Sequence, residues 1–205
     1  MAVMVGEALS RPGGRTAAVR SAVLTATEDA LIYRGFAGID LPEVAEAAGV
    51  GKTTVYRRWG SPQALVADLL TDMATQSVSA SDTGDLRTDL HANAALVVRT
   101  LRHRRQGPLF SALIAASTHD DGTKHALATF YDRRVDEWST CVTSAINRGD
   151  IPRDTDCGAV IRHLSAPLYY QFLTTTCPLA DRDVERTVNS TMASVAAEVF
   201  SSGPR

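Results

Sequence analysis

The residues with the clearest chemical potential lie in one stretch, AAGVGKTTVYRRW at positions 47–59. A glycine followed by Lys52 and Thr53 ends the phosphate-binding loop G-x-x-x-x-G-K-[ST], in which backbone amides and the lysine hold the phosphates of a nucleotide. The first glycine of that loop would be residue 46, but Glu46 stands there and its carboxylate would repel phosphate. The variant loop K-G-G-x-G-K-T fails at Ala47 and Ala48. The stretch therefore does not predict a nucleotide site.

The residues around the stretch indicate two short helices, whereas a phosphate loop follows a buried strand. The segment 41–48 has Asp40 as a cap and Pro42 in its first turn, and it ends at Gly49. A second helix is predicted over 52–58. Two short helices joined by a glycine turn of three or four residues form a helix-turn-helix.

Small and apolar residues stand where such a helix pair needs them. Ala45 allows the second helix to cross closely, and Gly49 supplies a left-handed backbone conformation that a side chain would resist. The small core and its edge would be closed by Val44, Val50, Val55, Tyr56 and Trp59.

The second helix would then expose positive charges and hydroxyls suited to DNA phosphates and base edges in the major groove. These residues are Lys52, Thr53, Thr54, Arg57 and Arg58. The alternative is a surface helical hairpin with a solvated charged face.

Residues 16–65 resemble the DNA-binding domain of the TetR (tetracycline-repressor) family of bacterial regulators. The family pattern stands here as RGFAGIDLPEVAEAAGVGKTTVYRRWGSPQAL, without a gap and with the spacing from Tyr56 to Trp59. More weakly, NRGDIPRDTD and APLYYQFL resemble linker and penultimate-helix segments of one subgroup. The resemblance implies a DNA-binding regulator, and because members of this family are usually repressors, it implies repression.

The resemblance also implies roles for individual residues. Lys52 and Tyr56 would contact the DNA backbone, and the bases would be contacted by Thr53, Thr54 and Arg57. Two positions depart from the family, because Gly51 replaces a frequent Ser and Pro62 replaces a frequent Lys; Ser61 and nearby amides could partly compensate. We expect basic residues of the N-terminal arm, Arg11 and Arg15, to reach the DNA backbone or minor groove.

Apolar residues recur at helical spacing along the rest of the chain and predict an all-α protein of about nine helices. We expect a flexible arm over 1–14, a helix-turn-helix domain over 15–61, and a larger helical domain over 62–205. The helices are expected over 16–35, 41–48, 52–58, 62–78, 86–101, 107–118, 121–147, 157–176 and from Asp181 onward, which would cap the last helix.

Composition agrees with a regulator of this kind. Hydrophobic residues make up 44% of the chain and charged residues 21%, which is ordinary for a globular protein. No apolar run approaches the roughly 18 residues of a membrane span, and no secretory signal is recognisable, so we expect a cytoplasmic protein without a membrane partner. Residues 11–60 hold seven Lys/Arg against five Asp/Glu, while 61–205 hold fourteen against seventeen. A weakly basic segment 11–60 followed by an acidic segment 61–205 is compatible with DNA binding by the first segment.

The larger domain is predicted to bind a small-molecule effector and to form a homodimer, both partly on the resemblance. An apolar pocket with a few polar groups is the usual form of such a site. Its candidate lining is Phe110, Leu113, Ile114, Phe130, Tyr131, Trp138, Tyr169, Tyr170 and Phe172, although core packing is the alternative for each. The candidate dimer interface is the stripe Val184, Val188, Met192, Val195 and Val199, and the alternative is that the stripe is core of one chain.

The other polar clusters are interpreted as structural rather than as ligand or metal sites. HDDGTKH at 119–125 could hold a metal, but Asp120 or Asp121 more simply caps a helix, so no metal and no cofactor is predicted. The run His103, Arg104 and Arg105 could meet an anionic ligand or could be a solvated helix end. Three widely spaced cysteines indicate neither a disulfide framework nor a zinc site, and a redox sensor is the alternative to inert thiols.

The predicted function is a ligand-responsive transcriptional regulator that binds a palindromic double-stranded DNA operator and is released by a small molecule. Two rival functions are an unrecognised helical enzyme and a helical protein-interaction module. The chain carries no nucleophile elbow, no H-E-x-x-H and no glycine-rich cofactor loop, so no enzyme is predicted.

Overall fold

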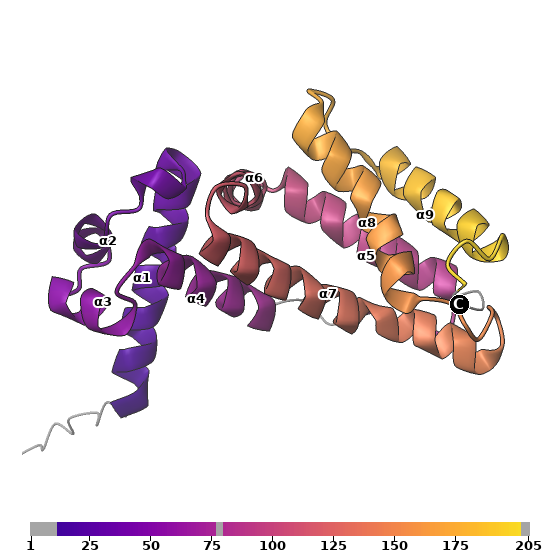
Figure 1. Ribbon diagram of the computed structural model, residues 1–205, viewed down its shortest axis with the longest axis horizontal. Coiled ribbons are helices and arrows are strands. Elements are labelled where there is room, and N and C mark those ends of the chain that lie inside the picture. Colours follow the sequence, from indigo (N-terminus) through magenta and orange to yellow (C-terminus); the bar gives the residue numbers. More distant parts are fainter. Residues whose placement is uncertain (1–11, 77–79, 202–205) are drawn as a thin grey trace, which may run out of the picture. The chain divides into compact units, whose positions relative to one another are not determined.

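A computed structural model describes residues 12–76 and 80–201 of the chain, which divides into two compact units between Leu69 and Leu70. Within the described ranges the regular structure is nine α-helices, one 3-10 turn and a single β-bridge between Thr155 and Ser201 (Figure 1). The prediction of an all-α fold is confirmed. Among these residues no helix is both long and apolar enough to cross a bilayer.

The first unit holds the helices expected for a helix-turn-helix. Its core is formed by the inner face of the first helix, with Val23 and Leu31 fully buried, and by Leu65 and Val66. The elements are α1 (Pro12–Arg34), the 3-10 turn η1 (Phe36–Gly38), α2 (Leu41–Ala47), α3 (Lys52–Arg58) and the first part of α4 (Pro62–Thr75).

The first helix starts earlier than predicted. Helix α1 begins at Pro12, so residues 12–14 belong to its first turn rather than to a flexible arm. Proline is well tolerated in a first helical turn because the amide it lacks would have no partner there. Arg15 is consequently an exposed residue of a helix, and Arg11 lies outside the described residues.

Helix α4 crosses the division between the two units. We expected the boundary before residue 62, whereas α4 starts there and the first unit extends to Leu69. The reason is a long-range contact, because Asp68 binds Arg20 of α1 and so ties the first half of α4 to the first unit. The Ser61 hydroxyl accepts from the amide of Ala64 and caps this helix as predicted.

The second unit is a bundle of five helices in which α5 packs against each of the other four. The predicted apolar stripe of α5, which starts at Leu86 and ends at Leu101, is buried. Helix α8 continues through Pro167, which lies inside it. The helices are α5 (Leu86–Arg102), α6 (Gln106–Ser117), α7 (Asp121–Arg148), α8 (Cys157–Thr174) and α9 (Asp181–Ala196).

Side-chain caps fix where these helices begin. Asp85, Asp120 and Asp156 each accept a hydrogen bond from the amide three residues on, at 2.7–2.9 Å. In α9 the prediction that Asp181 is the cap is wrong, since Ala180 is the N-cap and the buried carboxylate of Asp183 accepts from its amide at 2.8 Å. The buried carboxylate of Asp183 is fully paired, because the same Oδ2 also accepts from Nε2 of Gln171 at 3.3 Å and Oδ1 lies 3.3 Å from Nη1 of Arg186.

Candidate functional site

The turn between α2 and α3 has the backbone that the sequence predicted. Gly49 adopts a φ of 66°, in the left-handed region, and its amide donates to the carbonyl of Glu46. The Val50 amide donates to the carbonyl of Ala45, which closes the turn at 2.9 Å. Asp40 caps α2 by accepting from the amide of Glu43. A helix therefore precedes Lys52, and the phosphate-loop alternative lacks its strand.

Helix α3 has one buried and one exposed face. Val55 and Trp59 are buried on one side, and Ala45 of α2 is fully buried beneath the crossing. The opposite side is formed by Lys52, Thr53, Tyr56 and Arg57, all of which are exposed, while Thr54 is half-buried at the edge of this face. We call Lys52, Thr53, Tyr56 and Arg57 the α3 face.

The α3 face carries positive charge with no local neutralisation. Within the described residues neither Lys52 nor Arg57 has an ion-pair partner. Tyr56 was expected to anchor the core edge as well as to touch DNA, but its side chain is about half exposed and belongs to this surface. The face thus offers two cations and two hydroxyl-bearing side chains for phosphates and base edges.

Arg58 occupies a different place from the other candidates on α3. Its guanidinium lies over the Trp59 ring, 4.9 Å from the ring centroid. The same indole donates its N–H to Oδ2 of Asp68 at 2.9 Å, and Arg20 donates to Oδ1 of Asp68 at 2.7 Å. Arg58 is therefore part of a group of side chains that fixes the end of α3 against α1 and α4.

The Asp68 carboxyl is the centre of this group. Burial by itself would raise the pKa of Asp68, but hydrogen bonds from Arg20 and Trp59 outweigh that effect, and the charges of Arg20 and Arg58 act in the same direction. The pKa of Asp68 is consequently held below its usual 3.8. The carboxylate is charged at any pH near neutrality, where it positions the α3 face.

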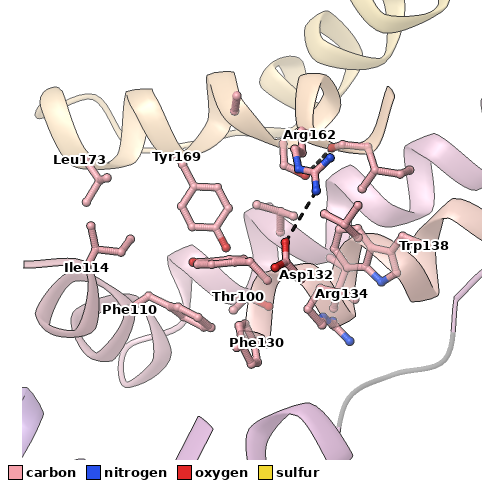
Figure 2. Close-up of a pocket in the computed structure, with 17 residues that line it drawn as sticks. Thr100, Phe110, Ile114, Phe130, Asp132, Arg134, Trp138, Arg162, Tyr169 and Leu173 are labelled. Carbon is pink, nitrogen blue, oxygen red and sulfur yellow. Dashed lines mark hydrogen bonds and ion pairs between the residues drawn. The ribbon is translucent and has the colours of Figure 1, made fainter. Parts of the chain in front are cut away.

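A cavity of about 400 Å³ lies within the second unit, between α5, α6, α7 and α8 (Figure 2). Its size falls in the range of small-molecule sites. In Figure 2 the Tyr169 ring reaches from α8 into the cavity, with Leu173 and Ile114 at one end and Trp138 at the other. Of the nine residues predicted to line a pocket, six do so: Phe110, Ile114, Phe130, Tyr131, Trp138 and Tyr169.

Three predicted lining residues lie elsewhere. Leu113 is fully buried in the core, and Tyr170 is 70% exposed, because one helical step from Tyr169 turns it onto the outer surface of α8. Phe172 is half-buried and does not line the cavity. The cavity is also lined by residues that were not predicted from the sequence: Leu96, Val97, Thr100, Asp132, Arg134, Val135, Ile161, Arg162, Ser165, Ala166 and Leu173. Several of these could have been found from helical spacing, because they lie three or four residues from the predicted aromatic residues.

The polar side chains that line the cavity are the phenols of Tyr131 and Tyr169, the hydroxyls of Thr100 and Ser165, and the charged groups of Asp132, Arg134 and Arg162. Burial raises the pKa of both Tyr131 and Tyr169, so both are neutral hydroxyls. The Tyr169 hydroxyl beside it raises the pKa of Tyr131 further, by its charge and as a weak acceptor, but the geometry between the two hydroxyls falls short of a hydrogen bond and no other described residue pairs with the buried Tyr131 hydroxyl. Asp132 and Arg162 form an exposed ion pair at 3.7 Å, which Figure 2 shows bridging α7 and α8.

Comparison with known proteins identifies the chain. The family "Bacterial regulatory proteins, tetR family" matches residues 23–69, and the family "Tetracyclin repressor-like, C-terminal domain" matches residues 80–191, more than half of the chain. The chain belongs to the TetR family. It is therefore related to DNA-binding transcriptional regulators and not to enzymes.

Relatives of this TetR-family protein span nearly its whole length. The DNA-binding transcriptional repressor TetR of Mycobacteroides abscessus is 31% identical over 179 residues, which cover 84% of this chain and 92% of the relative. The HTH-type transcriptional regulator YdeS of Bacillus subtilis is 27% identical over 184 residues, covering 89% and 92%. The crystal structure of the TetR family transcription regulator SCO0332 matches with a TM-score of 0.68 and 27% identity, covering 86% and 98%.

The apolar stripe predicted as the dimer interface of this TetR-family chain faces its own core. Val184, Val188 and Val195 are almost completely buried in α9, which packs against α5 and α8 of the same chain. They have almost no surface left for a partner, which favours the alternative that they are core of one chain. Met192 is half-buried, and Val199 is exposed beyond the end of α9.

The remaining polar clusters lie at a helix cap, in a turn and in the core. Asp120 caps α7, and the described residues contain no group of three or more potential metal ligands. His103 accepts weakly from the amides of Arg105 and Gln106 in the turn before α6, and the run 103–105 does not line the cavity. Burial, with the nearby charges of two aspartates, raises the pKa of Cys141 to about 12, which makes it inert.

Proposed function

We propose that this TetR-family regulator is a ligand-responsive repressor, which binds a palindromic operator as a homodimer and is released by a small molecule. The observation that carries the proposal is the α3 face, an exposed and uncompensated cationic surface on the second helix of a helix-turn-helix. In such motifs the second helix enters the major groove.

The residues of α3 fall into two groups by chemistry: those that would position the protein on the DNA backbone and those that would read the base sequence. Lys52 and Tyr56 suit phosphate oxygens, which fix register without reading sequence. Arg57 and Thr53 lie one turn apart on the same face and suit base edges, with Thr54 at the side. Arg58, held over Trp59, and Arg15, on the first turns of α1, would add charge near the DNA backbone.

A homodimer is proposed because one short recognition helix makes few contacts. Two helices related by a twofold axis would read half-sites about 34–36 Å apart or a multiple of this. The outer surface of α8 and α9 supports the proposal, since Tyr170 is a large exposed aromatic residue that lies one turn from the exposed Pro167, and neither lines the cavity. On α9 the small exposed residues Ser190, Ala193 and Ala197 would permit close packing of a second copy, in place of the buried valines.

Effector control is proposed for the cavity of the second unit. Helix α4 continues from one unit into the other, so a change of the bundle has a covalent and helical route to the DNA-binding unit. An effector that favours the conformation with lower DNA affinity must bind more weakly when DNA is present, by the same factor. A coupling of roughly 1–3 kcal/mol is ordinary for such systems.

A gel-shift series with the full chain and its own upstream intergenic DNA tests the proposal. We expect a discrete complex whose affinity falls steeply as salt rises, because binding releases counterions from the phosphates. The matched control is Lys124→Ala, which removes an exposed lysine from α7 of the second unit, whereas Lys52→Ala should weaken binding and flatten the salt dependence. Equal behaviour of the two variants, or no complex at any salt concentration, would leave the interaction-module rival in place.

A further inference from the structure

We propose that the cavity between α5, α6, α7 and α8 selects uncharged, planar aromatic molecules that carry a hydrogen-bond acceptor, and that the Tyr131 hydroxyl is the donor that selects them. The inference deepens the proposed function, because it rests on this cavity being the effector site. It assigns the chemical class of the effector and one specificity-determining residue.

The walls of the cavity favour a flat aromatic ligand. Phe130 and Tyr131 meet edge to face with centroids 5.3 Å apart, and Tyr131 and Tyr169 do so at 5.7 Å. Phe110 lies 5.8 Å from Phe130 in a tilted arrangement. Since edge-to-face pairs leave ring faces uncovered, a planar ligand can stack or pack edge-on within this cluster. The rest of the interior is largely aliphatic, with Ile114 and Ile161 among its residues.

The Tyr131 hydroxyl supplies the polar requirement. It is buried and has no hydrogen-bond partner among the described residues. Buried polar groups almost always have a partner, and one without a partner is costly to the folded protein. Because burial keeps this phenol protonated, it can donate a hydrogen bond to a carbonyl, ether or ring nitrogen. A ligand with an acceptor at this point would satisfy a group that the empty protein leaves unpaired.

The charges that line the cavity are already paired. Arg162 is joined to Asp132, and both side chains are more than half exposed. Arg134 binds Glu137 at 3.2 Å and lies over the Trp138 ring, 4.9 Å from its centroid. A charged ligand would have to break one of these pairs or enter an aromatic interior without a counter-ion, and desolvation of a charge is expensive. The cavity therefore disfavours anions and cations alike.

Four tricyclic probes of nearly equal size test the inference by direct binding to the full chain, measured by calorimetry and by quenching of tryptophan fluorescence. They are 9-fluorenone, which has a carbonyl acceptor; fluorene, which lacks it; fluorene-2-carboxylate, an anion; and proflavine, a cation. We expect 9-fluorenone to bind tightest and to exceed fluorene by about three- to tenfold, the worth of one neutral hydrogen bond.

Variants identify the donor. Tyr131→Phe should remove the preference for 9-fluorenone over fluorene while fluorene still binds, and it should not lower the melting temperature, because it deletes an unpaired buried hydroxyl. The matched control is Tyr33→Phe, at an exposed tyrosine of α1 outside the cavity, which should leave all four affinities unchanged.

Each opposing result overturns a stated part of the inference. Equal affinity for 9-fluorenone and fluorene, or no binding of any probe, overturns the proposed ligand class. Tightest binding of proflavine would indicate a cation-binding aromatic box instead, and tightest binding of the carboxylate would indicate an arginine anion site. A preference that survives in Tyr131→Phe but is lost in Tyr169→Phe overturns the assignment of the donor.

The experiments distinguish failure of the proposed function from failure of the proposed ligand class. If 9-fluorenone binds with the expected dependence on Tyr131 but does not release the protein from operator DNA, the effector role fails while the ligand class stands. If operator DNA is released by a charged probe that binds more tightly than 9-fluorenone, regulation by this cavity stands and the ligand class fails.

Discussion

The indole N–H of Trp59 donates a hydrogen bond of 2.9 Å to the carboxylate of Asp68, nine residues later in α4. Arg20 of α1 binds the same carboxylate, so one acidic group joins three helices of the DNA-binding unit. Trp59, the residue that follows α3, is thereby fixed by the Asp68 side chain, which lies outside the helix-turn-helix. We therefore expect DNA binding to depend on Asp68, which is not itself part of the α3 face.

Replacing Asp68 by Asn should lower the free energy of unfolding by about 1–3 kcal/mol, because it leaves the Arg20 and Trp59 donors poorly paired. Urea titration followed by circular dichroism measures the change. The control is Glu46→Gln, which alters an exposed carboxylate of α2 and should change stability little. Similar losses in both variants would contradict a special role for Asp68.

The same carboxylate predicts an acid-dependent loss of stability. The pKa of Asp68 is lower in the folded than in the unfolded chain, so its contribution is complete above pH 3.8 and is lost as pH falls through the lowered folded value. Between pH 5 and 2, stability should therefore decline more for the wild type than for Asp68→Asn. Parallel declines of the two proteins would show that Asp68 is not responsible.

Arg57→Ala should weaken operator binding more than binding to random DNA. A bidentate contact with a base edge is worth about 1–3 kcal/mol of discrimination, whereas a phosphate contact is lost equally on all sequences. Fluorescence anisotropy with operator and scrambled duplexes at one salt concentration measures both affinities. Arg153→Ala, at an exposed arginine of the second unit, is the matched control. An equal loss on both duplexes would reassign Arg57 to a phosphate.

Gly49→Ala should destabilise the protein by about 1–2 kcal/mol, because alanine is strained at a φ of 66°. A Cβ at Gly49 would meet no atom within 4 Å, so the effect comes from the backbone alone. Gly51→Ala is a close control, since Gly51 has a φ of −66° and a Cβ there would make only an ordinary contact with Oγ1 of Thr54 at 3.9 Å. Because Gly51 is the N-cap of α3, this control should lose a little stability, and urea titration should show the larger loss for Gly49→Ala. Equal losses in the two variants would refute the strain argument.

Tyr170→Glu should weaken dimerisation at least about tenfold if the outer surface of α8 and α9 pairs two copies, because a charge would be buried at the interface. Sedimentation equilibrium measures the association constant. Tyr33→Glu changes a tyrosine of α1 that is equally exposed and should leave association unaltered. An unchanged association constant in Tyr170→Glu would move the interface elsewhere.

The sequence predicts the helices well where local chemistry determines them. Asp40 and Ser61 begin helices by accepting a backbone amide three residues on, and Gly35 and Gly149 have left-handed conformations where helices end. These are effects of neighbours in the chain, which spacing and residue type reveal.

Features that depend on distant residues were not predictable in this way. The stripe along α9 shows which side of the helix is apolar, but not whether α5 and α8 or a second chain covers it. Tyr169 and Tyr170 are alike in sequence, and only the position of α8 places one in the cavity and the other outside. The extent of the first unit likewise depends on the contact between Arg20 and Asp68, 48 residues apart.

The continuity of α4 across the two units sets a practical rule for hybrid regulators. If the DNA-binding unit were cut after Gly60 and fused to the second unit of another regulator, it would lose Leu65, Val66 and Asp68, which form part of its core. The transplantable module instead extends through Leu69, in the middle of a helix, so the graft must preserve the helical phase of the recipient. Insertion or deletion of a single residue at that point would shift the helical phase of the residues of α4 that follow it by about 100°.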